Sequence, residues 1–446
     1  MTEPTVGPVT ERQRITELDV LRGVALFGVL LMNFVAFAGP HIIATEAQLA
    51  ALPTAAVDEW AFLATEWLVG DKANTMFATL FGLGFYLQMK RGEGRPGFEA
   101  RYRRRLFCLL VFGWLNATLL WVWDILNLYA LAGFALLVMR GWRTRSLVAF
   151  GLIAALYSDK VQNWWLGLAG VQLVPDAVYA DAAVLGRQAA ALSGDYPRIV
   201  ATMWQWTYTE WLAGGLIVAW SIYALGRFAL GAAIGRSGIL DDIPGHLPLL
   251  RRIAVVALPL GLVLALGVRL LSSDFWAPFE GSKVLGDTLR SPAALILASG
   301  YASGIVVAFH RPWGRALFGV FAPAGRMALT NYLAQGFLYA FVLFGVGPGL
   351  GLAGRIGTSA VIAICIAFYA AQIAFSHWWL ARFRFGPMEW VWRTLTYGER
   401  PAMRREQPRA ARSAGIQTGS HPLQSAPGTA RAARPSPAAA GAERSR

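Results

Sequence analysis

The chain has 446 residues, of which 56% are hydrophobic and only 15% are charged, and its mean hydropathy is +0.46. This composition excludes an ordinary soluble enzyme and predicts a protein with many membrane-spanning helices. The net charge of +14 does not indicate nucleic-acid binding, because the arginines cluster in short loops between apolar segments and in the carboxy-terminal tail.

Ten apolar segments are candidates for crossing a bilayer, which takes about 20 residues of helix. They lie at residues 18–38, 74–89, 106–122, 125–139, 146–165, 209–235, 253–272, 291–309, 325–346 and 357–381. Segment 58–70 is too short to cross and carries three acids, so we expect it at the membrane interface or beside a cavity. The predicted fold is an all-α polytopic bundle in one domain, 1–400, followed by a disordered cytoplasmic tail, 401–446.

The distribution of lysine and arginine over the loops predicts the orientation. Loops on the amino-terminal side of the membrane hold 19 of these residues, and the opposite loops hold 7. Because positive loops stay inside the cell, both termini are predicted to be cytoplasmic. The first segment could be mistaken for a signal peptide that is cleaved after Ala38, but its length and its charged residues favour a retained span.

The first span carries a group of polar residues, Asp19, Arg22 and Asn33. At about 100° per residue they share one stripe of a helix, which predicts that they face protein and not lipid. Asp19 and Arg22 are three positions apart and can form an ion pair. The alternative is an interfacial pair in which Arg22 reaches the lipid headgroups.

A second group lies around the turn between the third and fourth spans. Asp124 and Asn127 are one helical turn apart, and Asn116 precedes them in the third span. The short connection predicts that Asp124 lies just below the outer surface. The alternatives are a helix N-cap for Asp124 and interhelical hydrogen bonding for Asn116.

The ninth span begins with Arg326, Thr330, Asn331 and Gln335. Spacings of four residues predict that they share a helix face able to bind a carbonyl or a phosphate. The alternative is packing against polar neighbours.

After the last span, Gly386 and Pro387 break the helix, and Glu389 and Arg393 follow four positions apart. This spacing predicts a salt bridge within a short cytoplasmic helix, and a structural anchor is favoured over catalysis. No HExxH, Walker or strand-linked GxGxxG motif occurs, and neither cysteine has a metal-ligand spacing. The sequence therefore predicts no metal site, no bound cofactor, and no classical hydrolase or nucleotide-binding domain.

Five motifs occur in order: LDVLRGVA at 18–25, LFGLGF at 80–85, DIL at 124–126 with YAL at 129–131, GRMALTNY at 325–332, and GPMEW at 386–390. Together they resemble the YeiB-like family of bacterial inner-membrane proteins, a domain of unknown function (418), over residues 14 to 400. The resemblance implies a multi-pass protein of the bacterial inner membrane.

The opening helix is also distantly similar to that of transmembrane acyltransferases, which include the lysosomal enzyme that acetylates heparan sulfate glucosamine. This likeness implies that acyl-CoA acts as co-substrate on the cytoplasmic side and that an envelope acceptor is reached from the far side. Many YeiB-like sequences carry a histidine in the third span where this chain has Asn116. Because an amide cannot act as a general base, either His41 or Asp124 takes that role or the chain carries out no acyl transfer.

The leading hypothesis is acyl transfer to a lipid, sugar or small metabolite in a polar cavity between the first, third, fourth and ninth spans. Arg22 and Arg326 would hold anionic groups of the donor, and Asp124 would act as base. The acceptor would be oriented by Asn33, Asn116 and Asn331. The alternatives are a transporter or flippase that uses the same polar groups, or a membrane scaffold without catalysis. The sequence does not determine the oligomeric state.

Overall fold

The computed structural model describes residues 14–37, 39–169, 180–272, 281–346 and 349–405. These residues form helices and connecting turns, and an isolated bridge between Phe383 and Arg404 is the single β-pairing within these ranges. The prediction of an all-helical protein is confirmed.

The helices are α1 (Thr16–Met32), the π-helical turn η2 (Asn33–Phe37), α2 (Pro40–Ile43), α3 (Glu46–Ala50), α4 (Ala55–Leu68), α5 (Lys72–Gly92), α6 (Phe98–Leu119), α7 (Ile125–Val138), η3 (Met139–Gly141), α8 (Thr144–Ala169), α10 (Asp181–Leu192), α11 (Tyr196–Trp206), η4 (Thr207–Ala213), α12 (Leu216–Arg236), α13 (Ile243–Leu271), α14 (Ser282–Phe309), α15 (Pro312–Gly319), α16 (Ala322–Arg326), α17 (Ala328–Leu338), η5 (Tyr339–Leu343), α18 (Thr358–Arg382) and α19 (Pro387–Tyr397).

Each of the ten predicted apolar segments coincides with a helix or with consecutive helices of the structure. Within the described residues, five helical segments are long and apolar enough to cross a membrane: Thr16–Ile43, Leu216–Arg236, Ile243–Leu271, Ser282–Phe309 and Thr358–Arg382. The membrane class follows from these five helices. The count of ten crossings and the cytoplasmic position of both termini stay predictions.

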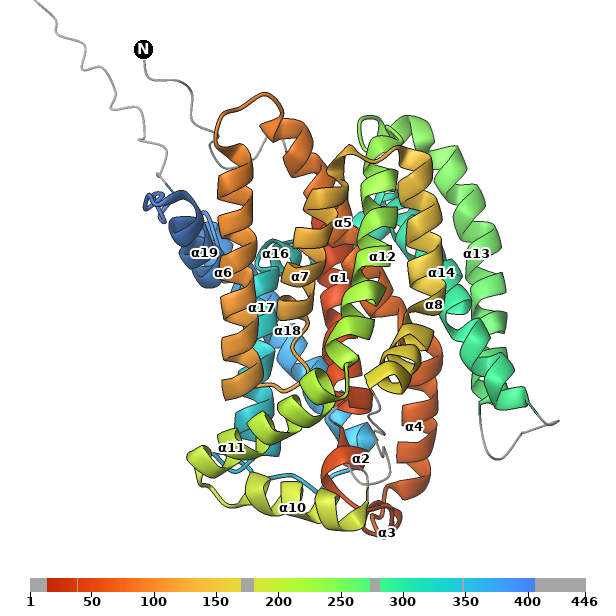
Figure 1. Cartoon of the computed structure of the whole chain (residues 1–446), viewed down its shortest axis with the longest axis vertical. Helices are drawn as coiled ribbons and strands as arrows, with labels where there is room; N and C mark the ends of the chain where they lie inside the picture. Colours follow the sequence, from red (N-terminus) through yellow and green to blue (C-terminus); the bar gives the residue numbers. More distant parts are fainter. Residues whose placement is uncertain (1–13, 38, 170–179, 273–280, 347–348, 406–446) are drawn as a thin grey trace, which may run out of the picture. The chain divides into compact units, whose positions relative to one another are not determined.

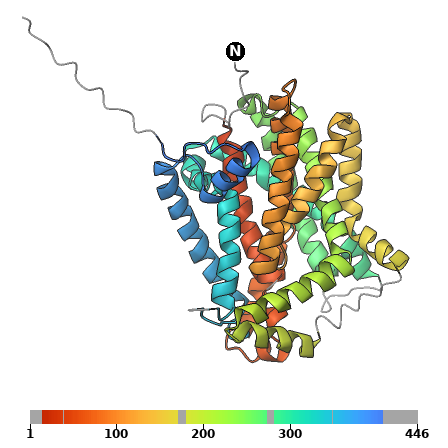
Figure 2. The same ribbon diagram turned by 60° about the vertical axis from the view of Figure 1, so that its left-hand side comes forward.

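The long helices form a bundle in which α12 packs against α5, α7 and α8, and α13 packs along α14 at one side (Figure 1). The short helices α2, α3, α10 and α11 gather at one end of the bundle. At the opposite end, α19 lies beside α6 (Figures 1 and 2). The main apolar core runs between α1, α5, α6, α7, α12, α17 and α18.

The connection between α6 and α7 is not a tight turn at the end of both helices. Arg140 pairs with Glu99 at 2.8 Å, so the helices are level at that end. Because α7 has 14 residues and α6 has 22, α7 begins roughly 12 Å short of the other end of α6. Residues 120–124 turn back into the bundle, and Asp124 is completely buried.

The predicted span 325–346 is also interrupted. Met327, with φ −107° and ψ 33°, separates α16 from α17, and the last turn, η5, is π-helical. Because the helix is interrupted at Met327, the side chains of Arg326 and Thr330 do not lie on one continuous helix face.

Residues 401–405, which the composition assigned to the tail, are held against the end of α18. The Arg384 backbone N–H donates to the Met403 carbonyl at 2.9 Å, and the indole of Trp390 donates to the Pro401 carbonyl at 2.8 Å. The rest of the predicted tail, 406–446, lies outside the described residues, as does Ala38 of the predicted cleavage site.

Close backbone packing holds α1 against α16. A Cβ atom at Gly23 would lie 2.2 Å from the Phe321 carbonyl oxygen, and one at Gly325 would lie 1.9 Å from the Asp19 carbonyl oxygen. Small residues allow such approach between helices in a membrane. This contact sets the distance between the helices that carry Arg22 and Arg326.

We predict that Gly23→Ala lowers the free energy of unfolding by about 1–3 kcal/mol, because the added methyl group forces α1 away from Phe321. The thermal unfolding midpoint of purified protein in detergent measures this loss. Gly267→Ala in α13 is the matched control, because no atom lies within 4 Å of its added Cβ. Equal midpoints for the Gly23 variant and the wild type would contradict the proposed contact.

Candidate functional site

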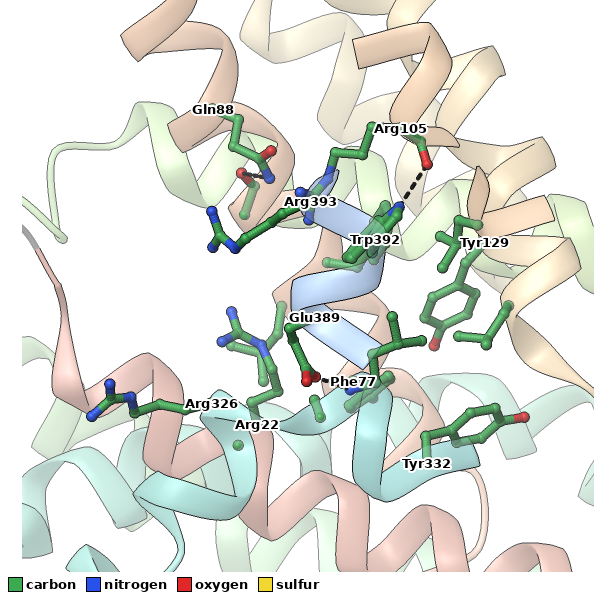
Figure 3. Close-up of a pocket in the computed structure, with 18 of the residues that line it drawn as sticks. Arg22, Phe77, Gln88, Arg105, Tyr129, Arg326, Tyr332, Glu389, Trp392 and Arg393 are labelled. Atoms are coloured by element: carbon green, nitrogen blue, oxygen red, sulfur yellow. Dashed lines mark hydrogen bonds between the residues drawn. The ribbon is translucent and has the colours of Figure 1, made fainter. Parts of the chain in front are cut away.

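An arginine-rich pocket with a cavity of about 230 Å³ lies between α1, α5, α6, α7, α16, α17 and α19 (Figure 3). Five arginines and one acid line it: Arg14, Arg22, Arg105, Arg326, Arg393 and Glu389. We call this site the arginine pocket. The first, third, fourth and ninth predicted spans all contribute to it, as expected, and α5 and α19 complete the wall.

The pocket has a charged side and an aromatic side. Figure 3 shows the guanidinium groups of Arg22 and Arg393 on one side of Glu389 and the rings of Tyr129 and Tyr332 on the other. On α5 the lining residues run from Gln88 at the helix end to Phe77, about 16 Å along the axis. An occupant therefore meets both cations and apolar rings.

The predicted ion pair on α1 is confirmed. The Arg22 Nη1 atom lies 2.9 Å from Asp19 Oδ1, and the Arg14 Nε atom lies 2.5 Å from Asp19 Oδ2. One buried carboxylate thus pairs with two guanidinium groups. Because Asp19 neutralises only one of the two arginines, this wall of the pocket carries an excess positive charge.

Arg105 and Arg393 bring two further cations from α6 and α19. The Arg105 guanidinium lies 3.6 Å from the centre of the Trp392 ring, and the Trp392 indole donates to the Arg105 carbonyl at 2.9 Å (Figure 3). Burial, and then the charge of Arg105, lower the pKa of Arg393 to about 10. Arg393 therefore stays protonated at neutral pH.

Glu389 does not form the predicted salt bridge with Arg393. Its Oε1 atom accepts the backbone N–H groups of Leu329 at 2.7 Å and Thr330 at 3.1 Å, and its Oε2 atom accepts the Thr330 hydroxyl at 2.6 Å. The Thr330 hydroxyl in turn accepts the Met388 N–H at 3.0 Å. Glu389 therefore caps the amino terminus of α17 from another helix, and Thr330 is held by that cap.

Arg326, Thr330, Asn331 and Gln335 do not share one face, because the break at Met327 separates the first from the others. The Asn331 side chain donates to the Ala324 carbonyl at 3.1 Å and to the Ser376 hydroxyl at 3.0 Å. Gln335 lies 3.5 Å from Gln372 on α18. Arg326 is the member of this group that lines the arginine pocket.

Asp124 has the geometry of a helix N-cap. Its Oδ1 atom accepts the N–H groups of Leu126 at 2.7 Å and Asn127 at 3.1 Å, and its Oδ2 atom accepts the Asn116 amide at 2.7 Å. The Tyr332 hydroxyl is an electrostatic neighbour of this carboxylate, and it accepts the Ile125 N–H at 3.1 Å. Asp124 lies outside the lining of the arginine pocket, but Tyr332 connects it to that lining.

The remaining predicted site residues lie elsewhere. Asn33 is buried in η2, eleven positions and about 16 Å along the helix from Arg22, so the two do not bind one small group. The rings of His41 and Phe62 of α4 pack edge to face, with their centroids 5.2 Å apart. The Asn127 Oδ1 and Asn116 Oδ1 atoms are buried without a hydrogen-bond partner in the structure.

Sequence reasoning missed Arg227, which is completely buried in α12. Its Nε atom donates to the Thr75 hydroxyl at 2.9 Å, its Nη1 atom donates to the Tyr223 carbonyl at 3.2 Å, and the guanidinium stacks 3.2 Å from the Tyr223 ring centre. No ion pair of the described residues includes Arg227. A lone arginine within the apolar segment 209–235 was the signal that could have found it.

Comparison with known proteins identifies the family. The chain is 32% identical over 395 residues to the uncharacterized protein YeiB of Escherichia coli (strain K12), an alignment that covers 86% of this chain and 96% of that protein. The chain belongs to the YeiB-like family. Residues 234–399 also match the family model described as "Protein of unknown function (DUF418)". This region includes Arg326, Glu389 and Arg393.

Two further relatives of this YeiB-like protein are similar over most of their length. The uncharacterized protein YxaH of Bacillus subtilis (strain 168) is 30% identical over 418 residues, which cover 88% of this chain and 96% of YxaH. An uncharacterized 39.9 kDa protein in the amylase 3' region of Bacillus acidopullulyticus is 26% identical over 410 residues, which cover 89% of this chain and 97% of that protein. No solved structure matches the chain.

Glu389 should give the stability of the protein a measurable pH dependence. Burial raises its pKa above the usual carboxyl value, although its three hydrogen bonds act in the opposite direction. Since the folded state binds this proton more tightly than the unfolded state, the contribution of Glu389 is largest at low pH and is lost as the pH rises through the raised pKa. The stability of Glu389→Gln relative to that of the wild type should therefore increase as the pH rises.

The measurement for Glu389 is the difference in unfolding midpoint between wild type and Glu389→Gln at several values from pH 4 to pH 8. Taking this difference removes the pH dependence that comes from titratable groups present in both proteins. A difference that is constant across this range would show that the pKa of Glu389 is not raised.

Arg227 allows a second test. Because it is a buried charge without a carboxylate partner in the described chain, Arg227→Met should be at least as stable as the wild type. Arg227→Lys keeps the charge but loses the planar fork of donors, and it should lower the free energy of unfolding by about 1–3 kcal/mol. The thermal unfolding midpoints of both variants in detergent, compared with that of the wild type, measure these changes in stability. A Met variant less stable than the Lys variant would contradict this account.

Proposed function

We propose that this YeiB-like membrane protein binds the phosphate groups of acyl-CoA in the arginine pocket and transfers the acyl group to a lipid, sugar or small-metabolite acceptor. The observation that carries the proposal is the convergence of five arginines from four helical regions on one cavity. The charge distribution of the loops supports a cytoplasmic mouth for this pocket in the bacterial inner membrane, where acyl-CoA is available.

The charge of the pocket supports a polyanionic ligand. Asp19 is shared between Arg14 and Arg22, and the oxygens of Glu389 are used by the backbone of α17 and by Thr330. Arg14 and Arg22 together therefore carry more positive charge than Asp19 neutralises. Guanidinium groups bind phosphate through paired, charge-assisted hydrogen bonds, and a bound phosphate would remove the mutual repulsion of these cations.

The size of the pocket supports a partly inserted ligand. A cavity of about 230 Å³ is smaller than the roughly 300–1,000 Å³ of typical small-molecule sites, so it accepts one end of an acyl-CoA and not the whole molecule. Phe77, Leu109 and Tyr129 line its inner part. This surface suits the acyl thioester, with the phosphates near Arg105 and Arg393.

The chemistry requires a path for one proton. In the proposed reaction an acceptor oxygen or nitrogen attacks the thioester carbonyl, the new C–O or C–N bond forms, and the C–S bond breaks. The acceptor proton passes to Tyr332 as the Tyr332 proton passes to Asp124, and it is then returned to the departing thiolate of CoA. The position of the Tyr332 hydroxyl beside Asp124, where it accepts the Ile125 N–H, supports this route, which requires no histidine.

Transport of a phosphorylated solute is the second candidate, and Arg227 is the observation that favours it. Tyr129 lines the arginine pocket, and Arg227 is one of its electrostatic neighbours. A second cation behind the inner wall could receive an anion that leaves the pocket. In that case the protein would bind its ligand without forming a bond to it.

We predict that Arg326→Gln and Arg393→Gln each weaken acyl-CoA binding by about 10- to 100-fold, because each removes a charge-assisted contact to phosphate. Binding of labelled acetyl-CoA to purified protein in lipid nanodiscs measures this change. Arg145→Gln is the matched control, because it removes an exposed arginine from the same predicted side of the membrane. Unchanged binding in both pocket variants would refute the proposal.

The same preparation distinguishes transfer from transport. With an extract of envelope acceptors, the wild type should transfer label from acetyl-CoA, and Tyr332→Phe should bind the donor normally but transfer it at least 100-fold more slowly. Binding without any transfer, together with uptake of a phosphorylated solute into proteoliposomes, would replace the acyltransferase with a transporter.

A further inference from the structure

We propose that a groove between the start of α13 and the end of α14 binds the headgroup of an anionic phospholipid, and that the acyl chains lie along the exposed face of α13. The groove encloses about 570 Å³. Its lining combines the cations Arg251, Arg252 and Arg311 with the apolar residues Leu247 and Val307. This site is separate from the arginine pocket and does not depend on the proposed acyl transfer.

The arginines of the groove are available to an anion. Arg251, Arg252 and Arg311 are exposed, and none of the ion pairs within the described part of the chain involves them. His310 also lines the groove, and its Nε2 atom lies 3.2 Å from Glu17 Oε1. The groove thus presents a cluster of positive charge that a phosphate would neutralise.

The surface beyond the groove is suited to acyl chains. Arg252, Val256, Leu260 and Val263 follow one another at spacings of four, four and three residues, so they form one stripe of α13. Val256 is 62% exposed and Val263 is 68% exposed, and only 22% of the most apolar window of this helix is buried. Lipid is the environment that covers such a face in a membrane.

The length of the stripe fits one leaflet. Arg252 and Val263 are eleven residues apart, which corresponds to about 16 Å of helix. Half of the hydrocarbon core of a bilayer is about 15 Å thick. A phosphate at Arg252 therefore places acyl chains along Val256, Leu260 and Val263. This match favours a phospholipid over free phosphate, which would use the arginines alone.

The test compares the full-length wild type with the double variant Arg251→Gln/Arg252→Gln. Both are purified in mild detergent, exposed to phosphatidylglycerol or phosphatidylcholine, and analysed by native mass spectrometry for retained lipid. We expect the wild type to retain phosphatidylglycerol in preference to phosphatidylcholine, and the double variant to bind it roughly 10- to 30-fold more weakly. Arg143→Gln/Arg145→Gln, which removes two exposed arginines at the start of α8, is the matched control and should behave as the wild type.

Thermal unfolding provides the second arm, with phosphatidylglycerol or inorganic phosphate added to each protein. Phosphatidylglycerol should raise the unfolding midpoint of the wild type more than that of the Arg251/Arg252 variant, and inorganic phosphate should not reproduce the shift. Equal lipid retention by both double variants would overturn the site. A shift reproduced by inorganic phosphate alone would overturn the lipid as its occupant.

Discussion

The structure depends on carboxylates that satisfy helix amino termini inside the bundle. The first N–H groups of a helix have no partner within it, and in a bilayer there is no water to replace one. Asp124 caps its own helix α7, whereas Glu389 reaches from α19 to α17, and Asp58 reaches from α4 to accept the Ser359 N–H of α18 at 2.7 Å. Each acid therefore allows a helix to begin within the protein. Two of these caps also tie together helices that are far apart in sequence.

These caps determine the shape of the arginine pocket. Because Glu389 caps a new helix, α17, that begins at Ala328, the chain turns at Met327, and Arg326 at the end of α16 lines the cavity. The close contact of Gly23 with Phe321 brings α1 and its Arg22 to the same place. Next to the Asp124 cap, the Ile125 N–H donates to the Tyr332 hydroxyl and holds this ring in the pocket lining. The pocket is thus a consequence of how the bundle accommodates interrupted helices.

Because these acids bind backbone N–H groups, they do not neutralise nearby arginines, and this explains where the protein carries excess positive charge. Asp58, Asp124 and Glu389 are committed to backbone N–H groups, and Asp19 is divided between two arginines. In the described chain, Arg14 and Arg22 of the arginine pocket share one acid, and Arg227 and Arg251 are in none of the ion pairs. Such excess charge is costly unless an anion binds, so these three places are where anionic ligands are expected.

The sequence by itself determined the features that depend on local spacing. Composition and apolar length gave the membrane class and the ten helical segments, the separation of three residues gave the Asp19–Arg22 pair, and the position before an apolar helix gave Asp124 as a candidate N-cap. Tertiary structure decided which residues form the pocket. Glu389 contacts Thr330 across 59 positions, Tyr369 donates to the Gly23 carbonyl across 346, and Arg227 meets Thr75 across 152. Helical periodicity relates only residues within a few turns of each other, whereas these contacts arise from the packing of helices whose neighbours no local pattern specifies.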